Sequence, residues 1–453
     1  MVKTTKEFVK GNGIEHSLNY QRKWIKLYEK VVMEMIGKPY HQLSKEETSH
    51  VRNGVNKEQY EALMETDGEL ITDIYEEVDV SHGYISMMER LNFLLETVYV
   101  HSHTLRSGRK VIQLDYAKLI GVKWNVISEN SRGIVFDADT LEVLSLPFHK
   151  FFNVNEREET RLENLNLTEK GYVMEKLDGT MVHVFMDDLD NGLYFATRGT
   201  VMNELHNRLA EDQFTTQKVN LDELRAIIQE GYTPLFELLL EESHEYRHIV
   251  SYDQREVRLI AMRHRKTGEY VIPAQLGIYA ERLGVESAIF DDKKTFFDVT
   301  LEKEFVQNTE GWVVMFESGH FVKVKAHQYM SLMDISFVKE NFDHKSSSLP
   351  KIVHEWMRHD IQDDKISQLP TQGMRDQAFG VVEDILDAVR KVKAEMQKVC
   401  DELYVESQKE FAQKLKNNPN IPTYAQVVIF KLRAGSEVGV KQIPPVLLEK
   451  HMK

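Results

Sequence analysis

The spacing of apolar residues divides the chain into three regions. In the first, apolar residues between positions 24 and 35 recur every three or four positions, which predicts an amphipathic helix. Ser44 lies three residues before Glu47, and this capping-box pattern predicts the start of another helix. We therefore expect residues 1–95 to form a helical N-terminal extension.

The second region, residues 96–330, alternates short apolar segments with turn residues, a pattern typical of β-strands. One amphipathic helix is expected within it, near residues 221–230. In the third region, residues 331–453, apolar residues from Val382 to Leu403 follow a helical stripe, so we expect this region to be all-helical. Together the patterns predict an α+β fold class.

One short motif in the strand-rich region carries candidate chemistry. Residues 175–180 read Glu-Lys-Leu-Asp-Gly-Thr, so Lys176 precedes an Asp-Gly turn by two residues. A lysine at a strand end can act as a nucleophile where burial and neighbouring cations favour its neutral amine. On its own the string also suits a hairpin turn with a solvated lysine, so other segments have to decide between the two interpretations.

Six further short segments of this kind occur nearby, each an apolar strand with one or two charged residues. Taken alone, such charges usually mark a solvated strand face or a protected edge. In chain order, the segments are 131–136 with Arg132, 147–156 with Lys150 and Phe152, 197–200 with Arg198, 235–239 with Glu237, 310–314 with Glu310 and Val313, and 321–325 with Lys323 and Lys325.

In this order and spacing, the seven segments resemble the nucleotidyltransferase motifs of covalent ligases. The resemblance is greatest to the bacteriophage tRNA-repair type of ATP-dependent RNA ligase, the RNA ligase 1 family, with motifs from Arg132 to Tyr329. It implies an ATP-grasp-like nucleotidyltransferase domain with antiparallel sheets over residues 96–330 and a helical RNA-specificity domain over residues 331–453. The strand alternation of an OB domain, which DNA ligases and capping enzymes carry after the lysine pair, is missing from this sequence.

The resemblance implies an RNA ligase (ATP) that joins 5′-phosphate and 3′-hydroxyl ends of single-stranded RNA, with a nicked tRNA anticodon loop as the expected substrate. In such ligases a lysine attacks ATP to form lysyl-AMP, the AMP passes to the RNA 5′-phosphate, and the 3′-hydroxyl then displaces it. By this resemblance Lys176 is the nucleophile, and Asp178, Lys323 and Lys325 complete the catalytic set. The expected cofactors are ATP and Mg²⁺ or Mn²⁺.

The resemblance also implies which residues bind these cofactors. The cations are expected to neutralise the triphosphate, and Glu237 to accept a ribose hydroxyl. A metal ion is expected at Glu310 and Tyr329, with Asp178 in support, largely through water. The residues expected to bind the nucleotide are Arg132, Lys150, Phe152, Glu175, Gly179, Arg198, Glu237, Val313, Lys323 and Lys325.

Three alternatives stay open at this point. The string His244-Glu245-Tyr246-Arg247-His248 matches a zinc metallohydrolase signature, which requires a helix, whereas its flanks predict a loop between strands. Another polynucleotide ligase of the same superfamily would share the motifs. A non-catalytic RNA-binding protein could retain the fold, but it would not need the full set of charged residues.

Composition adds limits on class and location. The chain has 453 residues, a net charge of −15 and one cysteine, Cys400, so neither an internal disulfide nor a cysteine zinc cluster is expected. No apolar run is long enough to span a membrane and no secretory pattern opens the chain, so we expect a cytoplasmic enzyme, in the host cytoplasm if phage-encoded. The sequence does not determine the oligomeric state, for which we take a monomer as the expectation. Since an acidic chain can still carry a basic groove, we predict local positive potential around Lys176.

Overall fold

The chain folds into two compact units, each assembled from segments far apart in the sequence. The first unit contains Met1–Trp24, Val98–Tyr116 and Val126–Asn341, and the second contains Ile25–Thr97, Ala117–Asn125 and Phe342–Lys453. The N-terminal and C-terminal helices thus fall in one unit, whereas the predicted boundaries near residues 95 and 330 treat them as two regions. The computed structural model describes residues 13–78, 86–117, 124–167, 169–244, 249–331, 349–367, 369, 372–405, 407–419, 421–436 and 438–452.

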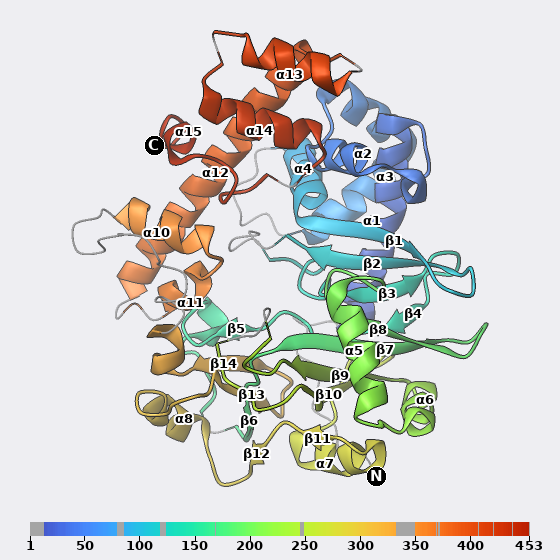
Figure 1. Ribbon diagram of the computed structural model, residues 1–453, viewed down its shortest axis with the longest axis vertical. Helices are drawn as coiled ribbons and strands as arrows, with labels where there is room; N and C mark the ends of the chain where they lie inside the picture. Colours follow the sequence, from blue (N-terminus) through green and yellow to red (C-terminus); the bar gives the residue numbers. More distant parts are fainter. Residues whose placement is uncertain are drawn as a thin grey trace. The chain divides into compact units, whose positions relative to one another are not determined.

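Three sheets form the framework of the first unit (Figure 1). The first is antiparallel, in the order β1-β2-β3-β4, and comprises β1 (Val98–Thr104), β2 (Lys110–Tyr116), β3 (Ile134–Asp137) and β4 (Val143–Ser145). The second has the order β11-β10-β9-β7-β8, with β10 and β11 parallel, and comprises β7 (Thr180–Asp187), β8 (Gly192–Ala196), β9 (Tyr232–Leu239), β10 (Glu256–His264) and β11 (Glu286–Ser287). The third has the order β12-β6-β13-β14-β5, with β14 and β5 parallel, and comprises β5 (Phe152–Asn153), β6 (Gly171–Glu175), β12 (Phe290–Asp291), β13 (Gly311–Phe316) and β14 (Phe321–Lys325).

Helices cover these sheets. The second sheet packs against α5 (Leu205–Thr216), α6 (Leu221–Gln229) and α7 (Pro273–Leu283), and α6 confirms the helix predicted near residues 221–230. Helix α8 (Phe296–Glu302) packs its buried side chains against the third sheet.

The third sheet shows how strand alternation builds a site as well as a core. On β13, Trp312 and Val314 point into the cluster under α8, whereas Val313 points the other way. Val313 pairs with Lys323 on β14, so the lysine lies on the face opposite to the α8 cluster. Lys325 shares the face of Lys323 because it lies two residues further along the strand.

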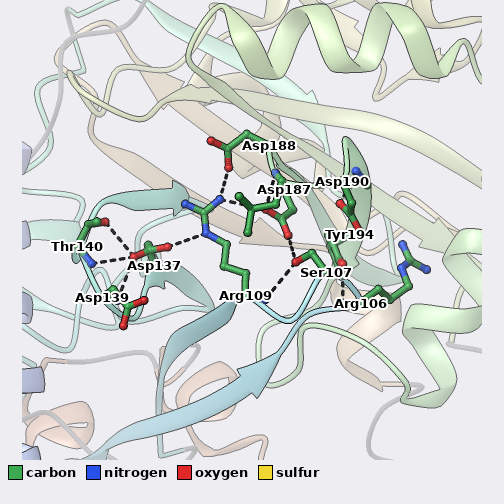
Figure 2. Close-up of polar contacts among 12 residues, drawn as sticks. Arg106, Ser107, Arg109, Asp137, Asp139, Thr140, Asp187, Asp188, Asp190 and Tyr194 are labelled. Carbon is green, nitrogen blue, oxygen red and sulfur yellow. Dashed lines mark hydrogen bonds and ion pairs between the residues drawn. The ribbon is translucent and has the colours of Figure 1, made fainter.

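A polar cluster joins the far ends of strands from two sheets (Figure 2). Arg109, just before β2, contacts Asp137 Oδ2 at the end of β3 with its Nε at 2.6 Å, and Asp187 Oδ1 at the end of β7 with its Nη1 at 3.0 Å. Asp188 accepts a further bond from Nη1, and Ser107 donates to Asp187. The guanidinium therefore ties the first sheet to the second through completely buried Asp187.

The regular secondary structure that the structure describes in the second unit is helical. Its elements are the C-terminal half of α1 (Gly13–Ile36), the 3₁₀ turn η1 (Tyr40–Gln42), α2 (Lys45–Arg52), α3 (Lys57–Glu77), α4 (Met87–Thr97), α10 (Leu349–Arg358), α11 (Gln362–Ser367), α12 (Gln372–Glu402), α13 (Gln408–Lys416), α14 (Thr423–Arg433) and α15 (Pro445–Glu449).

Each sequence pattern for these helices is confirmed. Trp24 and Val31 are buried on α1, and the stripe from Val382 to Met396 is buried on α12. Ser44 and Glu47 form the predicted capping box of α2.

Ion pairs and close packing join the N-terminal helices of the second unit to its C-terminal helices. Glu96, at the end of α4, pairs with Arg390 at 3.1 Å and with Lys393 at 3.6 Å, both on α12. Burial opposes ionisation of Glu96, but the charges of Lys393 and Arg390 outweigh it and lower its pKa. A β-carbon placed on Gly435 would lie 2.4 Å from the backbone of Glu46, so these two segments also pack closely.

The α+β class with predominantly antiparallel sheets and a helical C-terminal region is confirmed. None of the helices that the structure describes is long and apolar enough to cross a lipid bilayer.

Candidate active site

A cavity of about 280 Å³ lies between the second and third sheets of the first unit. Side chains from both sheets and from the loops before them form its wall. The residues that line it are Tyr116, Arg132, Phe148, Lys150, Phe151, Met174, Glu175, Lys176, Leu177, Gly179, Met181, Glu237, Ile260, Glu310, Val313, Met315, Lys323 and Lys325.

Lys176 lies at this wall, immediately after β6. Its backbone N–H donates to the carbonyl of Gly311 at 2.8 Å, which continues the pairing of β6 with β13. Its Nζ lies 2.5 Å from Glu310 Oε2, and Lys325 Nζ lies 3.2 Å from Glu310 Oε1. A carboxylate, rather than the cations expected from the sequence, is thus in direct contact with the Lys176 amine.

Glu310 is shared between these two lysines. Burial opposes its ionisation, but the ammonium groups of Lys176 and Lys325 outweigh this effect and hold the pKa of Glu310 below its usual value. Glu310 is therefore a carboxylate at neutral pH, with one cation on each oxygen.

Two glycines allow these groups to approach each other. A β-carbon on Gly179 would lie 2.5 Å from the carbonyl oxygen of Leu238 and 2.8 Å from Glu237 Cγ, so a larger residue would push β9 away. Gly311 has φ 129°, and a β-carbon there would lie 2.1 Å from the carbonyl oxygen of Val324. Both positions therefore require glycine.

Glu237 faces the cavity from β9 and has an unusual charge state. Burial raises the pKa of Glu237 to about 8. The positive charge of Lys176 acts to lower this pKa, but the negative charges of Glu310 and Asp178 offset that effect. The side chain is mostly a neutral acid at pH 7 and can donate a hydrogen bond as well as accept one.

Asp178 lies beside the cavity and does not line it. Its Oδ2 accepts from the backbone N–H groups of Ile249 and Val250 at 2.8 and 2.9 Å, and its Oδ1 accepts from the Tyr329 hydroxyl at 2.9 Å. Its own N–H donates to the Tyr252 hydroxyl at 2.9 Å. The structure thus brings Asp178 and Tyr329 together as hydrogen-bond partners. Tyr252 was missed from the sequence, where it carries no signal beyond an aromatic after a loop.

The predicted cations reach the cavity, but the predicted aromatic does not. Arg132, Lys150 and Lys323 line the wall, and the aromatic beside them is Phe151, whose ring lies 5.4 Å from the Arg132 guanidinium. Phe152 is buried on β5, where it pairs with β14. Adjacent residues in an extended chain point to opposite sides, so only one of the two phenylalanines can face the cavity.

Arg198 does not line the cavity but contacts Tyr116, a residue that does. Its Nε lies 3.2 Å from Asp115 Oδ1, and its guanidinium stacks 4.8 Å from the ring of Tyr116, which lines the cavity. Burial raises the pKa of Tyr116, but the charges of Arg132, Lys150 and Arg198 outweigh burial and lower it. Tyr116 lies outside the seven segments that carry the resemblance, so no motif marks it in the sequence.

The remaining predicted binding residues also lie at the cavity. Glu175 and Val313 line it, and Glu175 Oε1 accepts from the backbone N–H of Ile289 at 2.8 Å and lies 3.5 Å from Arg258. Apolar Met174, Ile260 and Met315 make up much of the wall around Val313. The cavity therefore combines an apolar part with a cationic part, as a nucleotide requires.

The donor groups near the cavity limit how a metal ion could be held. Among the residues that the structure describes, no three His, Cys, Asp or Glu side chains are grouped so that they could hold a metal ion. Glu310, which is ionised, could still contribute to a Mg²⁺ site of the kind that keeps several waters and binds substrate phosphates.

The zinc alternative falls mainly outside the described residues. His244 lies in a turn after β9, where its N–H donates to the Glu241 carbonyl at 2.9 Å. Residues 245–248 are not among those described, so this interpretation stays untested.

The segments that form the cavity are similar to known proteins. A family model described as RNA ligase matches residues 130–330. The "Putative RNA ligase" of Thermovibrio ammonificans is 27% identical over 321 residues, which cover 69% of this chain and 74% of that protein. RNA ligase 1 of bacteriophage TS2126 is 29% identical over 201 residues, which cover 43% of this chain and 49% of that protein. A solved archaeal ATP-dependent RNA ligase is 13% identical over 68% of this chain and 79% of its own, with a TM-score of 0.41.

The chain spans about three quarters of the first of these relatives and about half of the second. The matched residues 130–330 begin just before Arg132 and end just after Tyr329. They include each residue that lines the cavity apart from Tyr116. Residues 130–330, which contain Lys176 and Glu310, are therefore similar to the RNA ligase family.

Proposed function

We propose that this protein is an ATP-dependent RNA ligase, which seals 5′-phosphate and 3′-hydroxyl ends of single-stranded RNA through lysyl-AMP and RNA-adenylate intermediates. The observation that carries the proposal is the Lys176 amine, in contact with Glu310, at the wall of a cavity lined by four further cations. A nucleophile beside a concentrated positive field suits attack on a triphosphate.

The two parts of the cavity suit the two parts of ATP. The apolar side chains around Val313 suit the nucleoside, and Glu237 and Glu175 offer polar partners within reach of it. Arg132, Lys150 and the lysine pair of β14 suit the triphosphate, whose charge they would neutralise.

In the first step the Lys176 nitrogen forms a bond to the α-phosphorus of ATP, and the bond from that phosphorus to the bridging oxygen breaks and releases pyrophosphate. The amine must lose a proton before its lone pair can attack. The distance of 2.5 Å from Nζ to Glu310 Oε2 supports Glu310 as the group that orients the amine, and the other cations of the cavity favour the loss of its proton. Lys325 on the other oxygen keeps Glu310 in place.

We include a divalent metal, Mg²⁺ or Mn²⁺, in this proposal, held by Glu310 together with water and phosphate oxygens. Its chemistry would be to neutralise phosphate oxygens beside the reacting phosphorus. Tyr329, a predicted ligand, is better explained as the partner of Asp178, whose hydrogen bonds order the turn after Lys176.

The test is covalent labelling with α-labelled ATP and Mg²⁺. The wild-type chain should retain the label after denaturation, and Lys176→Ala should retain none because it lacks the nucleophile. Lys176→Arg should also fail, because a guanidinium stays protonated. Lys170→Ala, an exposed lysine just before the same strand, is the matched control and should label fully. Full labelling of the Lys176→Ala chain would overturn the proposal.

The finer parts of the proposal concern the substrate and its setting. We propose a nicked tRNA anticodon loop as the RNA, a cytoplasmic location and a monomeric enzyme. Sealing of a nicked anticodon stem-loop in preference to an unstructured RNA with the same ends would support the tRNA assignment, and equal sealing of both would contradict it.

A further inference from the structure

Two of the cations at the cavity come from loops. Arg132 lies in a series of turns and bends, residues 126–133, and Lys150 lies in an irregular segment, residues 146–151, which follows β4. We call these segments the two cation loops. Neither cation belongs to a strand, so strand pairing alone does not fix the distance between them.

A buried arginine, Arg263, contacts both cation loops. Arg263, on β10, is completely buried. Its Nη1 and Nη2 each lie 3.1 Å from Asn130 Oδ1, two residues before Arg132, and its Nη1 also donates to the Pro147 carbonyl at 2.8 Å, three residues before Lys150. One guanidinium thus bridges the two loops.

Tyr270 adds a second support beside it. The Arg263 guanidinium stacks 4.9 Å from the Tyr270 ring, and the hydroxyl of that ring accepts from the backbone N–H of His149 at 3.1 Å. The hydroxyl also lies 2.9 Å from His149 Nδ1. Burial, with the charges of Arg263 and Arg132, holds the pKa of His149 well below its ordinary value, so the ring is neutral and Nδ1 can accept the hydroxyl proton.

The loops are also joined directly, because the N–H of Lys150 donates to the carbonyl of Glu129 at 2.7 Å. A displacement of either loop would therefore move the other. The contacts from Arg263 and Tyr270 act on a single connected unit.

We propose that Arg263 and Tyr270 are positioning residues, which hold the two cation loops at the spacing that the triphosphate of ATP requires. This inference rests on the proposed function, because it takes the triphosphate as the ligand of the loops. Arginine suits the task and lysine does not: Nε donates to the Gly268 carbonyl at 2.9 Å while the two terminal nitrogens reach the loops, so the planar fork serves three acceptors in fixed directions.

The experiment compares the affinities of the full chain for ATP and for AMP by calorimetry. AMP lacks the two outer phosphates, so a displaced loop should weaken the binding of ATP and leave the binding of AMP nearly unchanged. For Arg263→Lys we expect the Kd for ATP to rise about tenfold, which corresponds to the loss of about 1.4 kcal/mol of binding free energy. The Kd for AMP should stay within about twofold of the wild-type value. The KM for ATP in lysine adenylation should rise with it, while kcat changes less.

Arg265→Lys is the matched control. Arg265 lies just beyond β10 and also donates to two carbonyls, those of Tyr232 and Ile228, but it contacts neither cation loop through them. Its replacement should leave the ratio of the two Kd values as in the wild type. An equal loss of ATP and AMP affinity in Arg263→Lys would show a merely structural role and overturn the inference.

Tyr270→Phe keeps the ring and removes the hydroxyl, so it decides the question if Arg263→Lys fails to fold. It should raise the Kd for ATP about threefold with little change for AMP, and an unchanged ratio would overturn the inference. Labelling of Lys176 is measured separately. A wild-type chain that forms no lysyl-AMP would contradict the ligase proposal, whereas the ratio of Kd values would still report on the loops.

Discussion

The carboxyl of Glu237 links the charge of the cavity to the stability of the fold. Burial raises its pKa to about 8, so the folded chain holds a proton that the unfolded chain loses near its ordinary pKa of about 4.3. The stabilisation is complete below that ordinary value and is lost as pH rises through about 8. The free energy of unfolding should therefore fall across this window, by up to about 1.4 kcal/mol per pH unit from this group.

We predict that Glu237→Gln loses this part of the pH dependence, because an amide stays neutral at every pH. Urea unfolding of both chains at pH 5 and pH 8 measures it: the variant should gain stability relative to the wild type as pH rises. Glu163→Gln, at an exposed position, is the control and should follow the wild type. Parallel curves for Glu237→Gln and the wild type would mean that Glu237 is already ionised at neutral pH.

The charged groups of the site were easier to identify from the sequence than the aromatic ones. Lys176, Glu310 and the lysine pair come together as expected, because a charged residue in an apolar strand stands out in sequence. Phe151 and Phe152 are chemically identical neighbours, so the sequence does not show which of them faces the cavity. That depends on where the pairing of β5 with β14 begins.

At the scale of elements, Arg109 holds strands together at the ends opposite to the site. Tyr116 ends β2 and Gly179 directly precedes β7 at the site, whereas the opposite ends of these two strands meet at the Arg109 guanidinium (Figure 2). Burial opposes ionisation of Asp187, but hydrogen bonds from Ser107 and Arg109 outweigh it and lower the pKa of that carboxyl. The ionised pair therefore stabilises the folded chain above the ordinary aspartate pKa.

We predict that Arg109→Met lowers the free energy of unfolding by about 2–4 kcal/mol at pH 7, since it leaves a buried carboxylate without its cation. The deficit should shrink as pH falls below about 4, where the aspartates take up protons. Chemical denaturation between pH 3 and pH 7 measures both effects. Arg106→Met is the control, because its ion pair with Glu211 is about half exposed on both sides and should contribute less than about 1 kcal/mol. A loss that is constant across this pH range would contradict the ionic explanation.

Elements were predictable where their pattern was local. The helices α1, α6 and α12 follow from apolar spacing, and the start of α2 follows from its capping box. The Arg109 cluster was not predictable, because its members come from three turns whose proximity depends on how two sheets pack.

At the scale of the molecule, we expect RNA selection to depend on the second unit and adenylation on the first. Helix α13 of the second unit exposes Lys409, Lys414 and Lys416, which are available to phosphates. Replacing all three with alanine should leave lysyl-AMP formation unchanged and weaken RNA binding. The slope of log affinity against log salt concentration should fall by up to about 2, because about 0.7 counterions are released per neutralised phosphate of a single strand.

The affinity for RNA is measured from 50 to 200 mM salt. Covalent labelling with α-labelled ATP is measured on the same preparation. Lys218→Ala, a lysine of the first unit that does not line the cavity, is the control. An unchanged salt slope in the triple variant would exclude α13 as an RNA contact, and a loss of labelling would contradict the separation of the two tasks.

The division into units could not be read from the sequence. Helical patterns identify the elements at both ends of the chain, but they do not say that α4 pairs with α12. That pairing includes one half-buried carboxylate and two cations, and charges of this kind are common on solvated helix faces.

The pair of Glu96 with Arg390 also has a consequence for how the protein is made. The two residues are 294 positions apart, so at ordinary elongation rates roughly 15 to 60 seconds separate their synthesis. During this interval the early helices of the second unit have no α12 to pack against, whereas every segment of the first unit has been made by Asn341. The order of translation thus completes the unit that holds Lys176 first, and a chain interrupted after that point would carry the nucleophile before the helical unit could close.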